Sequence, residues 1–283
     1  MSFTYNDIIE ELKERISYNE RQKDFDSIPE DLEISTITIC CSFDNEFDIE
    51  NITKWLKIDN NIEAVGKRDN NIKNVNNNHK KRGRRSLKVK KYKQNKGREH
   101  FFNQISLKVI VPNKANKRPV NIKLFKNGSV QMTGCSTLMD SLDAICTCMI
   151  ALNTVRGVII DNKIVDKKFC KVKLKASNLN DFKICLINSG FTLPFWINRG
   201  KLLEIMLADD INTFYDRNIH SGVIIKYKVI DTNITILVFE QGSVVITGAR
   251  ISQHMKEAYN FINTKLLENY IEIYKEQEVE YLY

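Results

Sequence analysis

The sequence lacks the features of several protein classes. Its 283 residues include only 4 prolines and 11 glycines, and no apolar run approaches 18 residues. These scarcities exclude a collagen-like chain and a membrane-spanning helix. The seven cysteines form no CxxC pair and are odd in number, so we expect neither a disulfide framework nor a zinc site. Residues 1–20 are too acidic and polar for a secretory signal, which leads us to expect an intracellular protein.

Catalytic patterns are equally scarce. The sequence contains no GxxxxGK[ST], HExxH or GxSxG motif, and its four histidines lie far apart. Asp140 and Asp143 are three residues apart on a predicted helix, where a solvated face is the better interpretation than paired catalytic acids. We therefore expect no enzymatic activity, no cofactor, no metal and no small-molecule substrate.

Positive charge is concentrated in one segment. Residues 67–99 hold fourteen Lys or Arg and two acids, net +12, whereas the whole chain carries +8, so the remainder is mildly acidic at −4. A basic tract on an acidic body favours an anionic, phosphate-bearing partner, with a solvated linker or a nuclear localisation patch as alternatives. The tract is low in complexity and has the character of an insertion. Its basic residues of interest are Lys80, Lys81, Arg82, Arg84, Arg85, Lys88, Lys90, Lys91 and Lys93.

Hydrophobic periodicity predicts a mixed order of elements. An amphipathic helix at 5–18 precedes the main body, which begins with a strand. The further elements are strand 32–42, helix 48–58, strands 101–111, 120–125 and 130–133, helix 136–152, strand 182–188, helix 198–208, a hairpin of strands 222–230 and 234–239 with its turn at 231–233, and helix 251–270.

Part of this order occurs twice. FKNGSVQMTG at 125–134 and FEQGSVVITG at 239–248 match at six of ten positions with a constant offset of 114. Phe102 and Lys108 are six residues apart, as are His220 and Lys226; each pair precedes its block, the first by four residues more, and a long helix follows both blocks. We therefore predict an α+β fold: a pseudo-twofold antiparallel sheet with helices on one face.

Period-two alternation predicts which side chains occupy the uncovered face of that sheet. Lys123, Gln131 and Thr133 share the side of Phe125, while Leu124, Val130 and Met132 pack beneath the helices. Around the second block, Leu237, Val245 and Thr247 share the side of Phe239. This uncovered face mixes aromatic, hydroxyl and apolar groups, as an interface does.

The two Phe-x-x-Gly-x-Val-x-x-Thr-Gly blocks, VFEQGSVVITGAR above all, closely resemble the signature of the TATA-box-binding protein family. INSGFTLPFWINRGKL and SGVIIKY resemble its divergent form in large DNA viruses. The resemblance implies a saddle of curved antiparallel sheet with helices on the convex face. It also implies an N-terminal extension at 1–28, a first repeat at 29–152 interrupted by the basic insertion at 67–99, an inter-repeat segment at 153–181, a second repeat at 182–270 and a tail at 271–283.

The same resemblance implies a function without chemistry. A family member binds A·T-rich promoter DNA in the minor groove, kinks it with aromatic wedges, and recruits a factor IIB-like protein and RNA polymerase. The implied wedges are Phe102, Phe125, His220 and Phe239. The implied groove-lining positions are Ile34, Lys123, Gln131, Thr133, Leu186, Leu237, Val245 and Thr247. The implied phosphate contacts are Lys108, Lys226 and Arg250.

The sequence also departs from the family pattern. Ile34 and Leu186 stand where the family has a pair of groove-reading Asn residues, and Ser129 and Ser243 stand where it has Lys. These departures keep a second hypothesis open: a saddle-fold protein-interaction module of the viral transcription machinery that has lost specific DNA binding. Loops 113–118 and 231–233 are the expected partner surfaces. The expected location is the host cytoplasm, in a viral factory, or the nucleus, with packaging in the virion as a further alternative.

Overall fold

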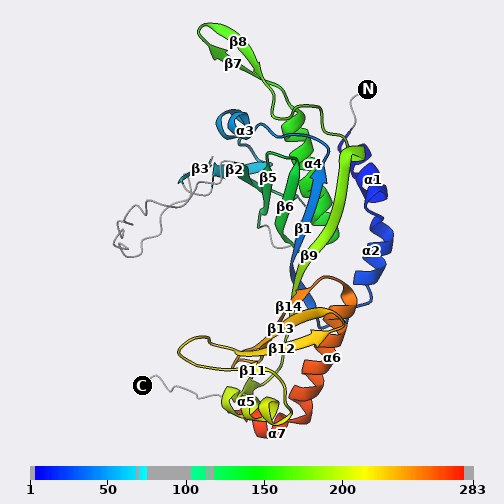
Figure 1. Cartoon of the computed structure of the whole chain (residues 1–283), viewed down its shortest axis with the longest axis vertical. Helices are drawn as coiled ribbons and strands as arrows, with labels where there is room; N and C mark the ends of the chain where they lie inside the picture. Colours follow the sequence, from blue (N-terminus) through cyan, green and yellow to red (C-terminus); the bar gives the residue numbers. More distant parts are fainter. Residues whose placement is uncertain (1–3, 68–69, 75–102, 113, 115–117, 277–283) are drawn as a thin grey trace. The chain divides into compact units, whose positions relative to one another are not determined.

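The computed structural model describes residues 4–67, 70–74, 103–112, 114 and 118–276 (Figure 1). The chain forms two compact units, which we name after the duplicated blocks. The repeat-1 unit comprises Cys41–Met132 and Asp143–Asn180, and the repeat-2 unit comprises Met1–Cys40, Thr133–Leu142 and Asp181–Tyr283. The strand β1 (Glu33–Phe43), the strand β6 (Ser129–Cys135) and the helix α4 (Leu138–Asn153) each contribute residues to both units.

The sheet of the repeat-1 unit has the strand order β6-β5-β4-β2-β3. Its other strands are β2 (Ile62–Lys67), β3 (Asn70–Asn74), β4 (Gln104–Val109) and β5 (Val120–Phe125), and a short helix, α3 (Ile49–Trp55), follows β1. Alternate residues of β4 and β5 are buried, as are Val130 and Met132 of β6. Ile145, Met149 and Leu152 of α4 pack around Ile122 and Leu124, so this helix covers the buried face.

The sheet of the repeat-2 unit has the strand order β11-β12-β13-β14-β9. These strands are β9 (Leu179–Thr192), β11 (Thr213–Phe214), β12 (Val223–Val229), β13 (Thr232–Val238) and β14 (Ser243–Ala249). The long helix α6 (Ser252–Glu268) packs against β12, β13 and β14 (Figure 1). The helices α5 (Arg199–Ala208) and α7 (Tyr270–Ile273) contact each other, and β10 (Trp196–Ile197) pairs with β15 (Tyr274–Lys275).

Two helices at the start of the chain belong to the repeat-2 unit. Our single expected helix at 5–18 is wrong in its end: α1 (Tyr5–Arg15) stops where Ser17 adopts a left-handed backbone with φ 53°, and α2 (Tyr18–Phe25) continues in a new direction. Asp24 of α2 accepts hydrogen bonds from the backbone and hydroxyl of Ser252, at the first turn of α6. Asp31 accepts one from the hydroxyl of Tyr259. These bonds fix the segment to α6.

The duplicated block forms the same tight turn in both units. Gly128 and Gly242 have φ values of +89° and +83°, which glycine adopts without strain. The carbonyl of Gly128 accepts a hydrogen bond from Phe43 N, and that of Gly242 accepts one from Leu193 N, both at 2.9 Å. A Cβ on Gly128 would lie 2.3 Å from the oxygen of Phe43, and one on Gly242 would lie 2.6 Å from that of Leu193. The sequence repeat is therefore a repeat of backbone geometry.

Three further sequence expectations are corrected. The β12–β13 turn consists of Ile230 and Asp231, because Val229 pairs with Thr232, so the turn expected at 231–233 lies one residue earlier. The last long helix ends at Glu268 rather than at Tyr270. Asp140 and Asp143 are buried, not solvated. Asp140 Oδ2 accepts hydrogen bonds from the backbone of Ser136 and Thr137, at 2.7 and 3.2 Å, and so caps the start of α4.

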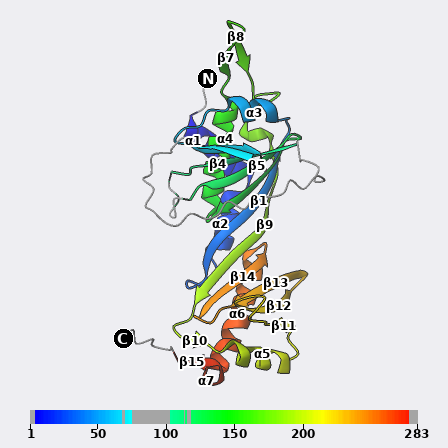
Figure 2. The ribbon, with the colours of Figure 1, turned by 90° about the vertical axis from the view of Figure 1, so that its left-hand side faces the viewer.

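The segment after α4 carries a hairpin that periodicity did not reveal. The strands β7 (Arg156–Ile160) and β8 (Lys163–Lys167) pair only with each other and extend from the rest of the repeat-1 unit (Figure 2). Their side chains are mostly exposed, so the usual alternation of buried and exposed residues is missing. Among the described residues, no helix is long and apolar enough to cross a membrane.

Candidate nucleic-acid interface

Each unit presents one sheet face that its helices do not cover. Buried and half-exposed residues alternate along β4, β5 and β6 in the repeat-1 unit and along β13 and β14 in the repeat-2 unit. We call the half-exposed side the open face of each unit. The groove-lining positions expected from the sequence that lie on these strands all fall on an open face: Lys123, Gln131, Thr133, Leu237, Val245 and Thr247.

Phe239 and His220 lie together at one end of the open face of the repeat-2 unit. Phe239 directly follows β13, and its backbone N donates to Ser243 O at 2.9 Å across the tight turn. A Cβ on Gly222 would lie 3.0 Å from Cε1 of Phe239, so the aromatic ring packs directly over this glycine. The His220 and Phe239 ring centroids are 6.0 Å apart, and His220 Nδ1 accepts from Gly222 N at 3.0 Å. These contacts hold both rings in place.

An apolar row crosses the middle of that open face. Leu237 is paired with Ile224 on one side and with Val245 on the other, and Val245 is paired with Gly190 of β9. All four are half-exposed. Ile224 was not singled out from the sequence, although it lies two residues before Lys226 and period two therefore places both on the same side of the strand.

A polar row lies beside the apolar one. Thr247 pairs with Thr235 and with Asn188, and Thr247 Oγ1 donates to Asn188 Oδ1 at 2.6 Å. Lys226 Nζ donates to Thr235 Oγ1 at 2.7 Å. Asn188 was not among the groove-lining candidates, but its position opposite Thr247 gives the open face an amide. Its signal in the sequence is its position two residues, one strand repeat, after Leu186.

The open face of the repeat-1 unit is more polar. Phe125 is half-exposed and pairs with Gln104, Lys123 pairs with Ser106, and Asn121 pairs with Lys108. Gln131 of β6 is also half-exposed, on the strand next to β5. Gln104 and Ser106 were not singled out from the sequence, because the long loop before β5 concealed the register of β4. Asn121 was also missed, although it shares the side of Lys123 and Phe125 on β5.

The remaining groove and phosphate positions are all accessible. Ile34 of β1 and Leu186 of β9 are half-exposed. Lys108 is half-exposed, and Lys226 and Arg250 are exposed, as phosphate contacts require. Phe102 and the basic residues between Lys80 and Lys93 lie outside the described residues. All of them lie between β3 and β4 in the chain.

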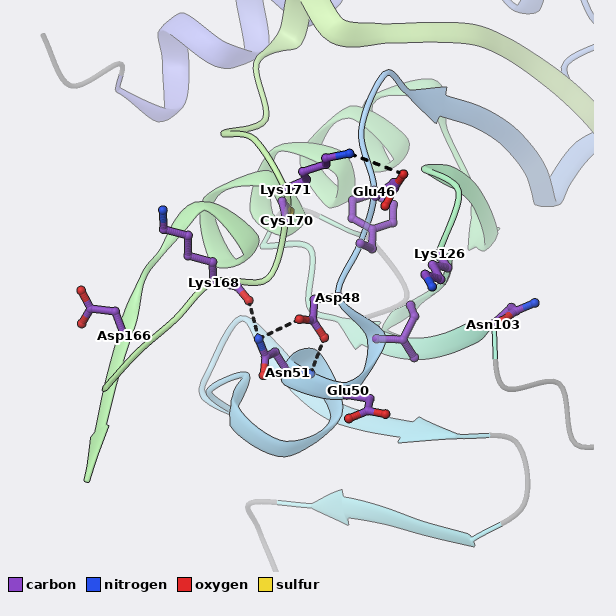
Figure 3. A pocket seen from close by; sticks show the side chains of 12 residues that line it. Glu46, Asp48, Glu50, Asn51, Asn103, Lys126, Asp166, Lys168, Cys170 and Lys171 are labelled. Atoms are coloured by element: carbon purple, nitrogen blue, oxygen red, sulfur yellow. Dashed lines mark hydrogen bonds and ion pairs between the residues drawn. The ribbon is translucent and has the colours of Figure 1, made fainter. Parts of the chain in front are cut away.

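The repeat-1 unit also has a groove of about 740 Å³, whose lining includes Asp48, Asn51 and Lys171 (Figure 3). Asp48 accepts from the backbone N of Asn51 at 2.9 Å and from its side chain at 2.8 Å, and Asn51 Nδ2 also donates to Lys168 O at 3.0 Å. Lys171 Nζ lies 3.8 Å from a carboxylate oxygen of Glu46. These polar groups of the lining therefore join the β1–α3 connection to the segment after β8. We assign them a structural role.

The described residues offer no sign of metal or thiol chemistry. No group of three or more His, Cys, Asp or Glu side chains among them is arranged to hold a metal ion. All seven cysteines are free thiols. Burial raises the pKa of Cys146 and of Cys170 to about 12. Burial, then the neighbouring Cys185 thiol, raises that of Cys40 to about 11. Protonated thiols are poor nucleophiles and poor ligands.

Comparison with known proteins agrees with this geometry. Residues 181–269 match the family model described as transcription factor TFIID, or TATA-binding protein. The chain is 32% identical over 254 residues to a TATA-box-binding protein-like protein of Acanthamoeba polyphaga mimivirus. The resemblance to the TATA-box-binding protein family is thereby confirmed. The match covers 84% of this chain and 65% of the mimivirus protein, so the chain spans just under two thirds of that relative.

A solved structure supports the fold. Methanococcus jannaschii TBP is similar to this chain with a TM-score of 0.51 and 18% sequence identity, over 84% of this chain and 99% of the archaeal one. At this identity the likeness concerns the fold alone. It confirms the expected α+β class with antiparallel sheet, and the repeated turns at Gly128 and Gly242 show how the two repeats build it.

Proposed function

We propose that this protein is a promoter-binding transcription initiation factor that binds A·T-rich DNA through the minor groove. The observation that carries the proposal is the repeated placement of Phe125 and Phe239. Each aromatic residue is half-exposed, at the end of a strand, directly before the tight turn at Gly128 or Gly242, and on the open face of its unit. Apolar wedges of this kind partly unstack base steps and kink the duplex.

The surrounding residues suit such a ligand. A minor groove at A·T pairs presents acceptors but no donor, so an apolar side chain packed there leaves no amino group of a base unpaired. Leu237 and Val245 match that surface in shape and polarity. Lys226 of β12 and Arg250, which directly follows β14, are exposed and can neutralise phosphates. The net +12 of the tract at 67–99 would add salt-sensitive affinity.

Recruitment of a factor IIB-like protein and RNA polymerase is part of the proposal. The β12–β13 turn is a candidate docking surface, because Ile230 and Asp231 are both exposed. Most of the loop at 113–118, the other expected partner surface, lies outside the described residues; within it Lys114 is buried and its Nζ donates to the carbonyl of Arg118 at 2.9 Å. We expect no catalytic step in this function.

A direct test is energy transfer between dyes at the two ends of a short A·T-rich duplex, titrated with the full chain at two salt concentrations. A G·C-rich duplex of equal length is the control. Increased transfer confined to the A·T-rich duplex would support minor-groove bending. Binding without bending and without sequence preference would contradict the proposal and assign the affinity to the basic tract.

The second candidate is a protein-interaction module that has lost specific DNA binding. Ile34 and Leu186 favour it, because both are half-exposed and apolar on strands where the family has groove-reading amides. This candidate predicts that neither duplex is bound or bent at physiological salt. The energy-transfer titration therefore separates the two functions.

A further inference from the structure

The open faces of the two units differ in chemistry at three matched positions. Leu237 and Val245 of the repeat-2 unit stand at the offset of 114 from Lys123 and Gln131 of the repeat-1 unit. The third match comes from strand pairing, because Ile224 is the partner of Leu237 just as Ser106 is the partner of Lys123. An apolar triplet in one repeat is thus a polar triplet in the other. The apolar triplet is Ile224, Leu237 and Val245, and the polar triplet is Ser106, Lys123 and Gln131.

The difference is confined to the open faces. On the covered faces of the same strands, both units bury only apolar side chains, each at most 4% exposed. These residues include Ile105, Leu107, Leu124, Val130 and Met132 in the repeat-1 unit and Val223, Ile225, Val238, Val244 and Ile246 in the repeat-2 unit. Packing under the helices therefore does not account for the polar triplet.

The polar triplet is also available for binding. Ser106, Lys123 and Gln131 are half-exposed, and none of the three side chains has a hydrogen-bond or ion-pair partner in the described part of the chain. A Ser hydroxyl and a Gln amide oxygen can accept hydrogen bonds, and a Lys ammonium can only donate. The triplet thus offers both acceptors and donors, whereas the apolar triplet offers neither.

The minor groove distinguishes base pairs by one group. Every pair presents acceptors there, and a G·C pair adds the amino group at N2 of guanine, which is a donor. Packed against Ile224, Leu237 and Val245, that amino group would lose its water without gaining an acceptor. Against the polar triplet it can donate to Ser106 Oγ or Gln131 Oε1, while Lys123 Nζ donates to the acceptors of any pair.

We propose that the protein recognises a two-part DNA element: the half bound by the repeat-2 unit must lack minor-groove amino groups, and the half bound by the repeat-1 unit tolerates them. This inference rests on the proposed minor-groove function. The preferred element is then A·T-rich in one half and open to G·C pairs in the other. Such an element is asymmetric, so it fixes one orientation of the protein on the promoter.

The test uses A·T duplexes in which 2,6-diaminopurine replaces adenine. This base places an amino group in the minor groove and leaves the adenine pattern of the major groove unchanged. Three duplexes of equal length carry the replacement in neither half, in one half or in both halves, and dissociation constants are measured for the full chain by fluorescence anisotropy. We expect about a twofold loss with one modified half, because one of two orientations remains, and about a tenfold loss or more with both.

Exchanging the triplets provides the matched control. Ser106→Ile, Lys123→Leu and Gln131→Val together should make the protein lose about tenfold with a single modified half. Ile224→Ser, Leu237→Lys and Val245→Gln together should make it tolerate modification of both halves. Because the two exchanges shift the response in opposite directions, a folding defect in one does not decide the result. Thermal unfolding of each variant identifies such a defect.

Two results would overturn the inference while leaving the proposed function in place. One is a tenfold loss for the unexchanged protein with a single modified half, and the other is no loss with both halves modified. Absence of binding to the unmodified A·T duplex would instead overturn the proposed function, and the inference with it. Inosine·cytosine pairs, which lack the amino group, should restore tight binding to a G·C-rich duplex if the exclusion acts in the minor groove.

Discussion

Thr247 donates a hydrogen bond from Oγ1 to Oδ1 of Asn188, with 2.6 Å between the two oxygens, across the β14–β9 pair of the repeat-2 unit. The bond occupies the amide oxygen and leaves the Asn188 amide hydrogens without a partner in the described residues. An amide held in this way can donate to the acceptors of an A·T minor groove. Asn188 can therefore replace the amide that Leu186 lacks, two residues earlier on the same strand.

Asn188→Ala should weaken binding to A·T-rich duplex about 3- to 10-fold, which is the range expected for one lost hydrogen bond. The dissociation constant from anisotropy titrations is the measurement. Asn260→Ala is the matched control, because Asn260 is exposed on α6, on the helical side of the sheet, and should leave the affinity unchanged. Equal effects of the two substitutions would remove Asn188 from the interface.

Phe239→Ala should clearly reduce DNA bending and change the unfolding temperature of the protein only slightly. Its ring packs over Gly222 beside His220 on the open face, so under the proposed function its loss removes a wedge rather than part of the core. Energy transfer across the duplex should fall towards the value of free DNA at saturating protein. Phe261→Ala is the control. Phe261 stacks on Tyr227 at a centroid distance of 4.0 Å, so that substitution should lower the unfolding temperature and leave the bend unchanged.

Lys226→Ala and Arg250→Ala should each flatten the salt dependence of binding. Both residues are exposed, and each phosphate contact contributes about 0.9 to the slope of log K against log salt concentration. We expect the slope to decrease by about that amount for each substitution, with the A·T preference retained. Lys265→Ala serves as the comparison, since Lys265 Nζ pairs with Asp209 at 2.7 Å on the helical side. A slope unchanged by all three substitutions would place the phosphate contacts elsewhere.

The sequence predicted the repeated core of the fold well. The alternation around Phe125 and Phe239 defined the correct open faces, and the glycines at 128 and 242 marked the turns, because only glycine fits a positive φ with a carbonyl so close. What it did not predict depends on long-range contacts. The covalent neighbours of Asp24 and Asp31 give no sign of the contacts with α6. Likewise, the capping role of Asp140 required the actual path of the chain before α4.

The turn glycines should be indispensable. Gly128→Ala would force a Cβ to within 2.5 Å of the carbonyl oxygens of Phe43 and Asn45 at a φ of +89°, so we expect a loss of about 3 kcal/mol or more in the free energy of unfolding. Gly200→Ala is the contrasting variant. Its Cβ would meet only Asn198 Oδ1 at 3.5 Å, within the helix α5, and should stabilise the protein by up to about 1 kcal/mol. Urea denaturation of both variants checks the pair.

High pH should weaken the attachment of the N-terminal segment. Burial, and then the hydrogen bond to Asp31, raises the pKa of Tyr259 to about 12. An unfolded tyrosine ionises near pH 10, so between about pH 10 and 12 the unfolded chain releases this proton first and is favoured. The stability that Tyr259 contributes is fully present below pH 10 and is lost as the pH rises towards 12.

Tyr259→Phe should therefore lower the free energy of unfolding by about 1 kcal/mol at pH 8, for the lost hydrogen bond, and flatten its decline above pH 10. Urea unfolding at pH 8, 9, 10 and 11 measures both effects. Tyr227→Phe should keep the decline of the unmodified protein, because the Tyr227 hydroxyl has no hydrogen-bond partner in the described residues. If the free energy of unfolding of Tyr259→Phe declines with pH as that of the unmodified protein does, ionisation of Tyr259 does not cause the decline. The hydrogen bonds between Asp24 and Ser252 must then hold the N-terminal segment alone.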